Sequence, residues 1–258
     1  MLALRRPAFS AVYPWPRPLA VQRHITRAVT FDAGQTLIDL DLDFLAARLG
    51  ERGVHADPAV LGLATPAAWT HYDQLVESGA DHITGWKGFI GRVLEGGGIR
   101  DAALVDWLYT ENRPRNLWRR PIAGMVELAR ELRGRGVRVA VLSNSEGMLE
   151  ELLVEIGLAE AFDTIIDSGR VKLEKPGREI FDHTLAALGV HAADAVHIGD
   201  SFNADIVGAR GAGWRAIWFG RRIAPPGTAG RPPIDDPGVA IARDAGEVRA
   251  ALRRWNVT

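Results

Sequence analysis

The sequence predicts an α/β fold, a doubly wound and mainly parallel sheet that carries an inserted, all-helical domain. Three observations indicate it. Short apolar runs recur along the chain, helical patterns alternate with the later runs, and a long stretch of helical patterns alone separates the first run from the second. Alternating strands and helices favour βαβ units with right-handed crossovers. A chain of 258 residues has room for one such domain and a smaller insert.

The predicted strands are short runs of apolar and β-branched residues. A short, nearly continuous apolar run is typical of a parallel strand that helices cover on both faces. We predict strands over residues 28–31, 137–142, 195–198 and 216–219.

Helical patterns follow the strands of the predicted core domain, which comprises residues 27–40 and 120–258. Gly134 and Gly136 end the first of these helices before the next strand begins. The proline-rich segment 220–238 is expected to form an irregular surface loop. The predicted helices span residues 124–132, 147–158, 179–188 and 245–253.

Residues 41–119 are predicted to form the inserted helical domain. The interval between the first two strands is too long for one crossover helix, and it holds helical patterns with no convincing strand. We interpret the triple glycine at 96–98 as a helix end and loop, and we expect Trp69, Trp86 and Trp107 to form part of a helical core. The predicted helices span residues 43–49, 66–76, 86–94 and 102–112.

The first 26 residues differ from the rest in composition. They are rich in arginine and proline, and no acidic residue precedes Asp32. A basic, acid-poor start is one mark of a transit peptide, but the prolines interrupt any amphipathic helix. We therefore interpret residues 1–26 as a disordered leader or as the product of an over-long predicted start.

Charge and composition exclude several classes of partner. The net charge of −1 gives no electrostatic footprint for nucleic acid or for an anionic membrane. No apolar run approaches the roughly 20 residues of a membrane span. Without cysteine the chain has no disulfide, thiolate metal site or cysteine nucleophile, which fits a cytoplasmic protein. We expect a small, anionic substrate and either a monomer or a homodimer.

Polar residues stand at the ends of three predicted strands. Asp32 follows the first, Ser143 and Asn144 follow the second, and Asp200 comes just after the third. Lys175, ahead of a predicted helix, is a fourth polar point. Ligands of open parallel sheets lie beyond the carboxyl ends of the strands. Any one of these residues could be a helix cap or a turn residue, but their joint order predicts one shared site.

The order and spacing of these points resemble the haloacid dehalogenase superfamily of hydrolases over about residues 28–220. Residues 30–37 look like its first motif and residues 141–144 like its second. Lys175 and the proline after it are similar to the third motif, and residues 197–205 to the acidic fourth. The helical insert stands where one subfamily has its cap. The resemblance implies a Rossmann-like core with a helical cap domain.

The resemblance implies hydrolysis through a covalent intermediate on Asp32, the nucleophile of the first motif. Thr36 is the threonine that accompanies this nucleophile in the family pattern. Ser143 and the backbone amide of Asn144 would hold the transferred group. Lys175 would offset charge around the nucleophile and favour its ionised form.

The resemblance also implies Mg²⁺, a cation that prefers hard oxygen ligands and keeps several waters. The predicted ligands are the carboxylates of Asp32 and Asp200 and the backbone carbonyl of Gly34. Asp205 is expected to support the site, either near the metal or as an acceptor that orients Lys175 or a water.

The first motif departs from the family pattern at Gly34. Family phosphatases usually carry a second aspartate there, which protonates the leaving group and then activates water. General acid–base assistance is typically worth about 10²–10⁴-fold. Nearby Asp39 and Asp41 are interpreted as hinge or cap residues. A weak or substituted acid would suit good leaving groups, such as those of aryl or acyl phosphates.

Three functions are compatible with this pattern. We favour Mg²⁺-dependent phosphatase-type hydrolysis of a small phosphorylated metabolite. A 2-haloacid dehalogenase-like hydrolase, acting at carbon without metal, would need no second aspartate, but such enzymes usually carry a small polar residue in place of Asp200. A catalytically weak binding protein on the same scaffold need not retain Asp32, Lys175, Asp200 and Asp205.

Overall fold

The computed structural model describes residues 27–220 and 236–257. The predicted leader, residues 1–26, lies outside these ranges, as does most of the predicted loop 220–238. Among the described helices, none combines the length and the apolar character that a membrane crossing requires.

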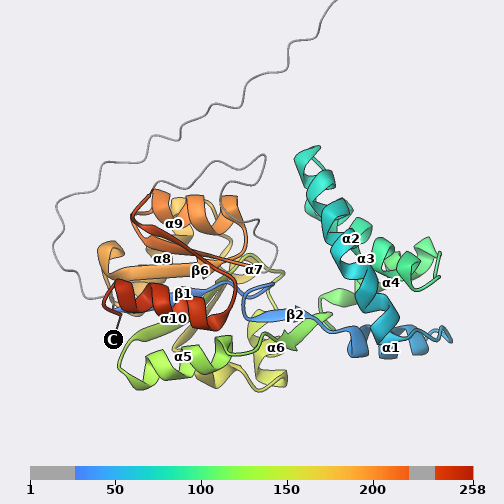
Figure 1. The fold of residues 1–258 in the computed structure, drawn as a ribbon, viewed down its shortest axis with the longest axis horizontal. Coiled ribbons are helices and arrows are strands. Elements are labelled where there is room, and N and C mark those ends of the chain that lie inside the picture. The colour runs from blue at the N-terminus through green and yellow to red at the C-terminus, as the bar shows by residue number, and fades with distance from the viewer. Residues whose placement is uncertain (1–26, 221–235, 258) are drawn as a thin grey trace, which may run out of the picture.

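A six-stranded parallel sheet forms the centre of the core (Figure 1). β1 (Ala28–Phe31) lies between β4 (Arg138–Ser143) and β6 (Ala195–Gly199), and β7 (Arg215–Phe219) pairs with β6. From β1 the chain adds strands first on one side and then on the other, which is double winding. The predicted fold class is confirmed, and the predicted ends of these four strands agree to one residue.

The two outermost strands were not predicted. β5 (Thr164–Asp167) pairs with β4, and β8 (Val239–Ala242) pairs with β7. Both mix half-buried with buried residues along four positions. An edge strand has a neighbour on one side only, so it lacks the continuous apolar run that marks the central strands.

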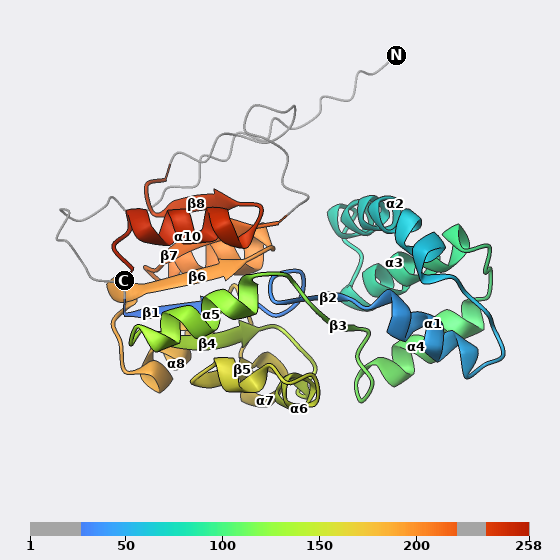
Figure 2. The ribbon, with the colours of Figure 1, turned by 60° about the horizontal axis from the view of Figure 1, so that its bottom comes forward.

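Helices cover both faces of the sheet (Figure 2). Alternate side chains of β1 pack into two separate apolar cores, one on each face. The first core is closed by α5 (Met125–Gly134), α6 (Leu149–Glu155) and α10 (Ala245–Arg254). The second is closed by α8 (Arg178–Leu188) and α9 (Gly208–Gly211), and the one-turn helix α7 (Ser168–Val171) follows β5.

The inserted segment forms a helical unit with an apolar core of its own. Trp86 is buried in this core, and Trp69 and Trp107 pack half-buried against it, as expected. Its helices are α1 (Leu42–Gly50), α2 (Pro58–Glu77), α3 (His82–Gly96) and α4 (Ala102–Asn112).

Three helices differ from their predicted bounds by three residues or more, and local backbone signals explain the differences. α3 begins earlier than predicted, at His82, and the Asp81 carboxylate caps it by accepting the Thr84 N–H at 2.7 Å. α2 begins earlier than predicted, at Pro58, which is tolerated in a first turn, and the Asp57 carboxylate accepts the Ala59 N–H at 2.8 Å. α6 ends earlier than predicted because Gly157 takes a left-handed conformation with φ of 71°. The predicted end of α3 at the triple glycine is confirmed, with φ of 78° at Gly98.

A two-stranded antiparallel ribbon connects the sheet to the helical unit (Figure 2). It consists of β2 (Ile38–Leu40) and β3 (Trp118–Pro121). The expectation of no strand within residues 41–119 is wrong at its end, because β3 begins at Trp118. That strand is half-buried to exposed, so its sequence carries no apolar run. We propose this ribbon as the boundary between the core and the cap.

Candidate active site

The carboxyl edge of the sheet brings the predicted polar residues together. Asp32 follows β1, Ser143 ends β4 and Asp200 follows β6, and these three strands are neighbours in the sheet. Lys175 reaches the same edge from the loop before α8. The strands point toward the helical unit, which lies beyond this edge (Figure 1).

Lys175 is the centre of the cluster. Its side chain is 1% exposed, and its ammonium donates to Asp32 Oδ1 at 2.8 Å, to Asp205 Oδ1 at 2.6 Å and to the Leu142 carbonyl at 2.8 Å. An ammonium has three N–H donors, so all three are used. Burial alone would lower the pKa of Lys175, but the two carboxylates outweigh it and hold the pKa above its ordinary value.

Asp205 is held from both of its oxygens. Its Oδ1 lies 3.0 Å from His197 Nε2 as well as beside Lys175, and its Oδ2 accepts the Ser201 N–H at 2.8 Å. A Cβ at Gly199 would collide with this side chain, so glycine is required for the close approach. Burial raises the pKa of Asp205, but the charge of Lys175 and the hydrogen bond from His197 bring it well below the usual range.

Asp32 has a different balance of charge. Burial raises the pKa of its carboxyl group, the Lys175 ammonium offsets the rise only in part, and the Asp205 carboxylate adds to it. The Lys175 charge is shared between two carboxylates. A further positive charge at the site would favour the ionised form of Asp32.

Asp32, Asp200 and Asp205 form a group that fits a hard cation. One oxygen from each lies within 4.8 Å of the others. The backbone carbonyl of Asp200 is fixed by the Trp218 indole N–H at 2.9 Å. Because both oxygens of Asp205 already accept hydrogen bonds, Asp32 and Asp200 are the carboxylates better placed as ligands. The Gly34 carbonyl stays a predicted ligand.

Ser143, the last residue of β4, and Asn144, the residue after it, lie at the site. Ser143 is buried at the end of the strand. The Asn144 side chain donates to the Lys175 carbonyl and accepts the Lys175 backbone N–H, both at 2.9 Å. This amide bridge ties the lysine loop to β4. This bridge was not predicted, because the prediction for Asn144 concerned only its backbone amide.

Thr36 lies in the tight turn after Asp32. It is fully buried, and its backbone N–H donates to the Ala33 carbonyl at 3.4 Å. Within the described ranges its hydroxyl has no hydrogen-bond partner. The role that the family resemblance gives to Thr36 stays a prediction.

We call Gly34 and Gln35 the front loop. In contrast to the closely packed groups around Lys175, the space beside this loop is open. A Cβ built on Gly34 meets no atom within 4 Å beyond its chain neighbours. Gln35 has a left-handed backbone, with φ of 58°, and its amide donates to Asp39 Oδ1 at 2.9 Å. Asp39 also accepts the Leu40 N–H, and Asp41 caps α1 through the Phe44 N–H. Asp39 is therefore hydrogen-bonded within the β2 segment, and Asp41 is hydrogen-bonded at the start of α1.

Thr30 and His197 are site residues that the sequence argument missed. Both are fully buried, on β1 and β6, where they are register partners. Thr30 Oγ1 lies 2.7 Å from His197 Nδ1. Burial lowers the pKa of His197, and the hydrogen bond to Asp205 offsets this only in part. The available signal was a polar residue inside each of two strands that are otherwise apolar. We call Thr30, His197, Asp205 and Lys175 the buried cluster.

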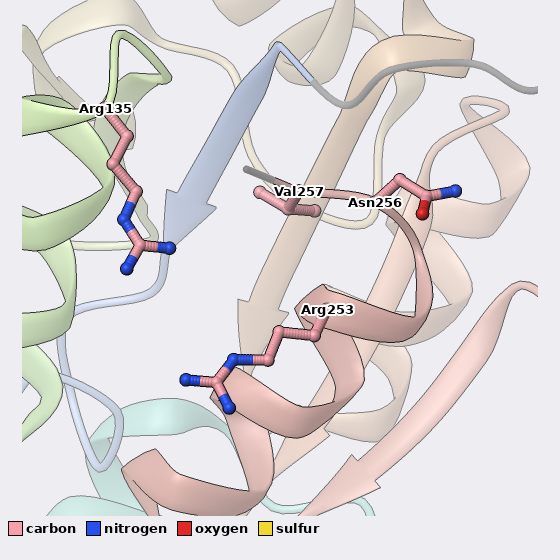
Figure 3. A pocket seen from close by; sticks show the side chains of 4 residues that line it. All are labelled: Arg135, Arg253, Asn256 and Val257. Atoms are coloured by element: carbon pink, nitrogen blue, oxygen red, sulfur yellow. The ribbon is translucent and has the colours of Figure 1, made fainter.

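A surface pocket lies away from this edge (Figure 3). It is formed at the ends of α5 and α10 by Arg135, Arg253, Asn256 and Val257. Arg135 is paired with Glu131 at 2.7 Å. None of the predicted site residues lines this pocket, so it is not the predicted active site.

The doubly wound parallel sheet thus carries a buried carboxylate–lysine–carboxylate cluster at its carboxyl edge, where open parallel sheets bind their ligands. Comparison with known family models identifies the family to which the chain belongs. The family model described as haloacid dehalogenase-like hydrolase matches residues 26–213. The chain belongs to this family, and it is a hydrolase.

Individual relatives extend this similarity. The chain is 30% identical over 204 residues to the haloacid dehalogenase-like hydrolase domain-containing protein 3 of Bos taurus, covering 74% of this chain and 80% of the relative. It is 34% identical over 171 residues to a phosphoserine phosphatase of Thermus thermophilus, covering 63% and 66%. Among solved structures, the HAD-hydrolase YfnB of Bacillus subtilis bound to magnesium shares the fold, with a TM-score of 0.65, 21% identity and coverage of 88% and 99%.

Proposed function

We propose that this protein is a Mg²⁺-dependent phosphatase that hydrolyses a small phosphorylated metabolite through an aspartyl-phosphate. The observation that carries the proposal is the position of Asp32, 2.8 Å from the Lys175 ammonium and grouped with the Asp200 carboxylate. The similarity to a phosphatase of Thermus thermophilus supports phosphate ester chemistry.

In the proposed first step, a carboxylate oxygen of Asp32 attacks phosphorus and the bond from phosphorus to the leaving oxygen breaks. Water then attacks the phosphorus of the aspartyl-phosphate, which releases inorganic phosphate and restores the Asp32 carboxylate. Ser143 and the Asn144 backbone amide would hold the phosphoryl oxygens. Lys175 keeps the charge around Asp32 balanced.

The donor set fits Mg²⁺. Asp32, Asp200 and the Gly34 carbonyl would hold the ion, with waters completing its shell. When bound, Mg²⁺ supplies positive charge next to the nucleophile and the phosphoryl oxygens. A cation at this position would favour the ionised form of Asp32. Burial raises the pKa of Asp32, and the Lys175 ammonium alone does not cancel that rise.

The missing general acid restricts the proposed substrates. Gly34 has no side chain, and Asp39 is engaged with Gln35 and the backbone of Leu40. The leaving oxygen must then depart with little protonation, which suits aryl and acyl phosphates. The helical unit beyond the sheet edge would exclude water and select the substrate. The absence of cysteine fits a cytoplasmic site of action.

A substrate panel tests the proposal. Aryl, acyl and sugar phosphates and a 2-haloacid are each assayed with Mg²⁺ and with chelator, beside Asp32→Asn. We expect phosphate release from the aryl and acyl phosphates that needs Mg²⁺ and is lost in Asp32→Asn. Halide release that persists in chelator would instead establish a dehalogenase. If none of the panel is turned over faster than by Asp32→Asn, the result would favour a catalytically weak binding protein.

A further inference from the structure

The deepest part of the site holds a histidine that cannot reach a substrate. His197 and Thr30 are both fully buried. The Phe181 ring packs against the imidazole in a T-shaped arrangement, with ring centroids 5.8 Å apart at 85°. A side chain enclosed in this way acts only through the groups that it contacts.

The hydrogen bonds around His197 fix where its proton lies. Asp205 Oδ1 is a carboxylate oxygen and can only accept, so Nε2 carries the hydrogen in the 3.0 Å contact. In the neutral ring Nδ1 is then an acceptor, and the Thr30 hydroxyl donates to it at 2.7 Å. Asp205 thereby sets the tautomer of His197, and the Thr30 hydroxyl, which can donate or accept, completes the hydrogen bonding of Nδ1.

His197 and Ser201 together fix the plane of the Asp205 carboxylate. His197 holds Oδ1, and the Ser201 backbone N–H holds Oδ2 at 2.8 Å. Lys175 donates to the same Oδ1 at 2.6 Å and to Asp32 at 2.8 Å. Rotation of the Asp205 carboxylate would move one of the three acceptors of Lys175 and disturb its contact with the nucleophile.

We propose that His197, held at Nδ1 by Thr30, is a positioning residue: it holds Asp205 so that Lys175 stays directed at Asp32. The inference rests on the proposed phosphatase reaction for its effect on turnover. The positioning itself is a statement about Lys175 and can be measured in the absence of any reaction. A histidine that served only to fill space would be replaced without loss by another ring.

The test uses two substitutions of His197. His197→Phe keeps the ring and removes both nitrogens, whereas His197→Gln retains an amide N–H that can donate to Asp205. With an aryl phosphate and Mg²⁺, we expect His197→Phe to lower kcat by about 10–100-fold with little change in KM, as is typical for supporting partners of a metal or reaction site. His197→Gln is expected to recover most of the loss.

Thr30→Val tests the hydrogen bond at Nδ1 with a nearly isosteric change. It removes the hydroxyl that donates to Nδ1, and we expect kcat to fall by less than in His197→Phe. Thr184→Val is the matched control, because Thr184 is also fully buried and its hydroxyl donates only within α8, to Ile180 at 2.7 Å. This control is expected to retain the activity of the unsubstituted protein.

A second readout does not depend on turnover. In ¹⁵N-labelled protein with chelator, the buried Lys175 ammonium should give an exchange-protected N–H signal, assigned by its loss in Lys175→Met. We expect the signal to be lost in His197→Phe and kept in His197→Gln. Thermal unfolding of each variant shows whether it is folded, and if His197→Phe does not fold, Thr30→Val and His197→Gln still decide.

Two results would overturn the positioning role. One is a folded His197→Phe that keeps both kcat and the Lys175 signal, and the other is a His197→Gln that loses as much as His197→Phe. If the unsubstituted protein turns over no phosphate, the proposed function fails, while the Lys175 signal still decides the role of His197. The two failures are therefore distinguishable.

Discussion

The buried cluster behind Asp32 and the front loop beside it differ in how completely their groups are paired. Behind Asp32, every N–H of the Lys175 ammonium and both oxygens of Asp205 have partners. In front, the space next to Gly34 is open to 4 Å. The hydrogen bonding behind Asp32 is thus complete, whereas position 34 carries no acidic side chain that could protonate a leaving group. Such a site should hold a phosphoryl group well and depend on the substrate to supply a good leaving group.

The largest expected effect comes from filling the front loop. Gly34→Asp places a carboxyl group in open space, so folding should be unaffected. If the missing acid is the main defect, turnover of alkyl phosphates should rise by up to about 10²–10⁴-fold, measured as phosphate release with Mg²⁺. Gly34→Asn, of similar size and without the acid, is the control. No gain in folded Gly34→Asp would mean that the cap or another chemistry is limiting.

Breaking the buried cluster should cost stability as well as activity. Lys175→Met leaves Asp32 and Asp205 buried without their cation, and removal of one partner from a buried ion pair typically costs about 3–5 kcal/mol. Urea unfolding in chelator measures this loss. Lys87→Met is the matched control, because Lys87 pairs with Asp106 at the surface, where a pair is worth about 0–1 kcal/mol. Equal losses in both variants would contradict the importance of burial.

A pair of glycine substitutions compares the two regions directly. Gly199→Ala forces a Cβ into the Asp205 side chain, and overpacking of this kind typically costs about 1–3 kcal/mol. Gly34→Ala adds the same methyl group to open space and should change the free energy of unfolding little. Chemical denaturation of both variants tests the contrast, and a Gly34→Ala loss as large as that of Gly199→Ala would refute it.

The smallest expected effect is a dependence of stability on pH that His197 introduces. Burial lowers the pKa of His197 in the folded state, while in the unfolded chain it titrates near about 6.5. Between the two values the unfolded state binds more protons, so stability rises with pH, is fully present above about pH 6.5 and is lost as pH falls below it. The slope from one group is at most about 1.4 kcal/mol per pH unit. Urea unfolding in chelator should show this slope reduced in His197→Gln, and an identical slope would contradict it.

The central strands and most helices could be predicted from the sequence, because the strands are continuous apolar runs and the helices have a periodic apolar pattern. β1, β4, β6 and β7 are buried on both faces, so their runs are almost entirely apolar. The edge strands and the β2–β3 ribbon lack this signal, since their burial comes from neighbours that are distant in the chain.

For the candidate site, the residues at strand ends could be predicted from the sequence, but the contacts behind them could not. Residues at strand ends, such as Asp32 and Asp200, could be assigned to one edge from the order of the strands alone. The contact between Thr30 and His197 could not, because it depends on the register of β1 against β6. The bridge from Asn144 to the backbone of Lys175 depends on the path of a loop, which no local pattern reveals.

The central claim is that the buried cluster is fully hydrogen-bonded and that position 34 lacks a general acid. The dependence of kcat/KM on the leaving group tests this claim most directly. A series of aryl and alkyl phosphates that differ in leaving-group pKa would be compared in the unsubstituted protein and in Gly34→Asp, with Mg²⁺. We predict that kcat/KM falls steeply as the leaving-group pKa rises, and that Gly34→Asp flattens this dependence. A shallow dependence that Gly34→Asp leaves unchanged would contradict the account, because it would show that another group already protonates the leaving oxygen.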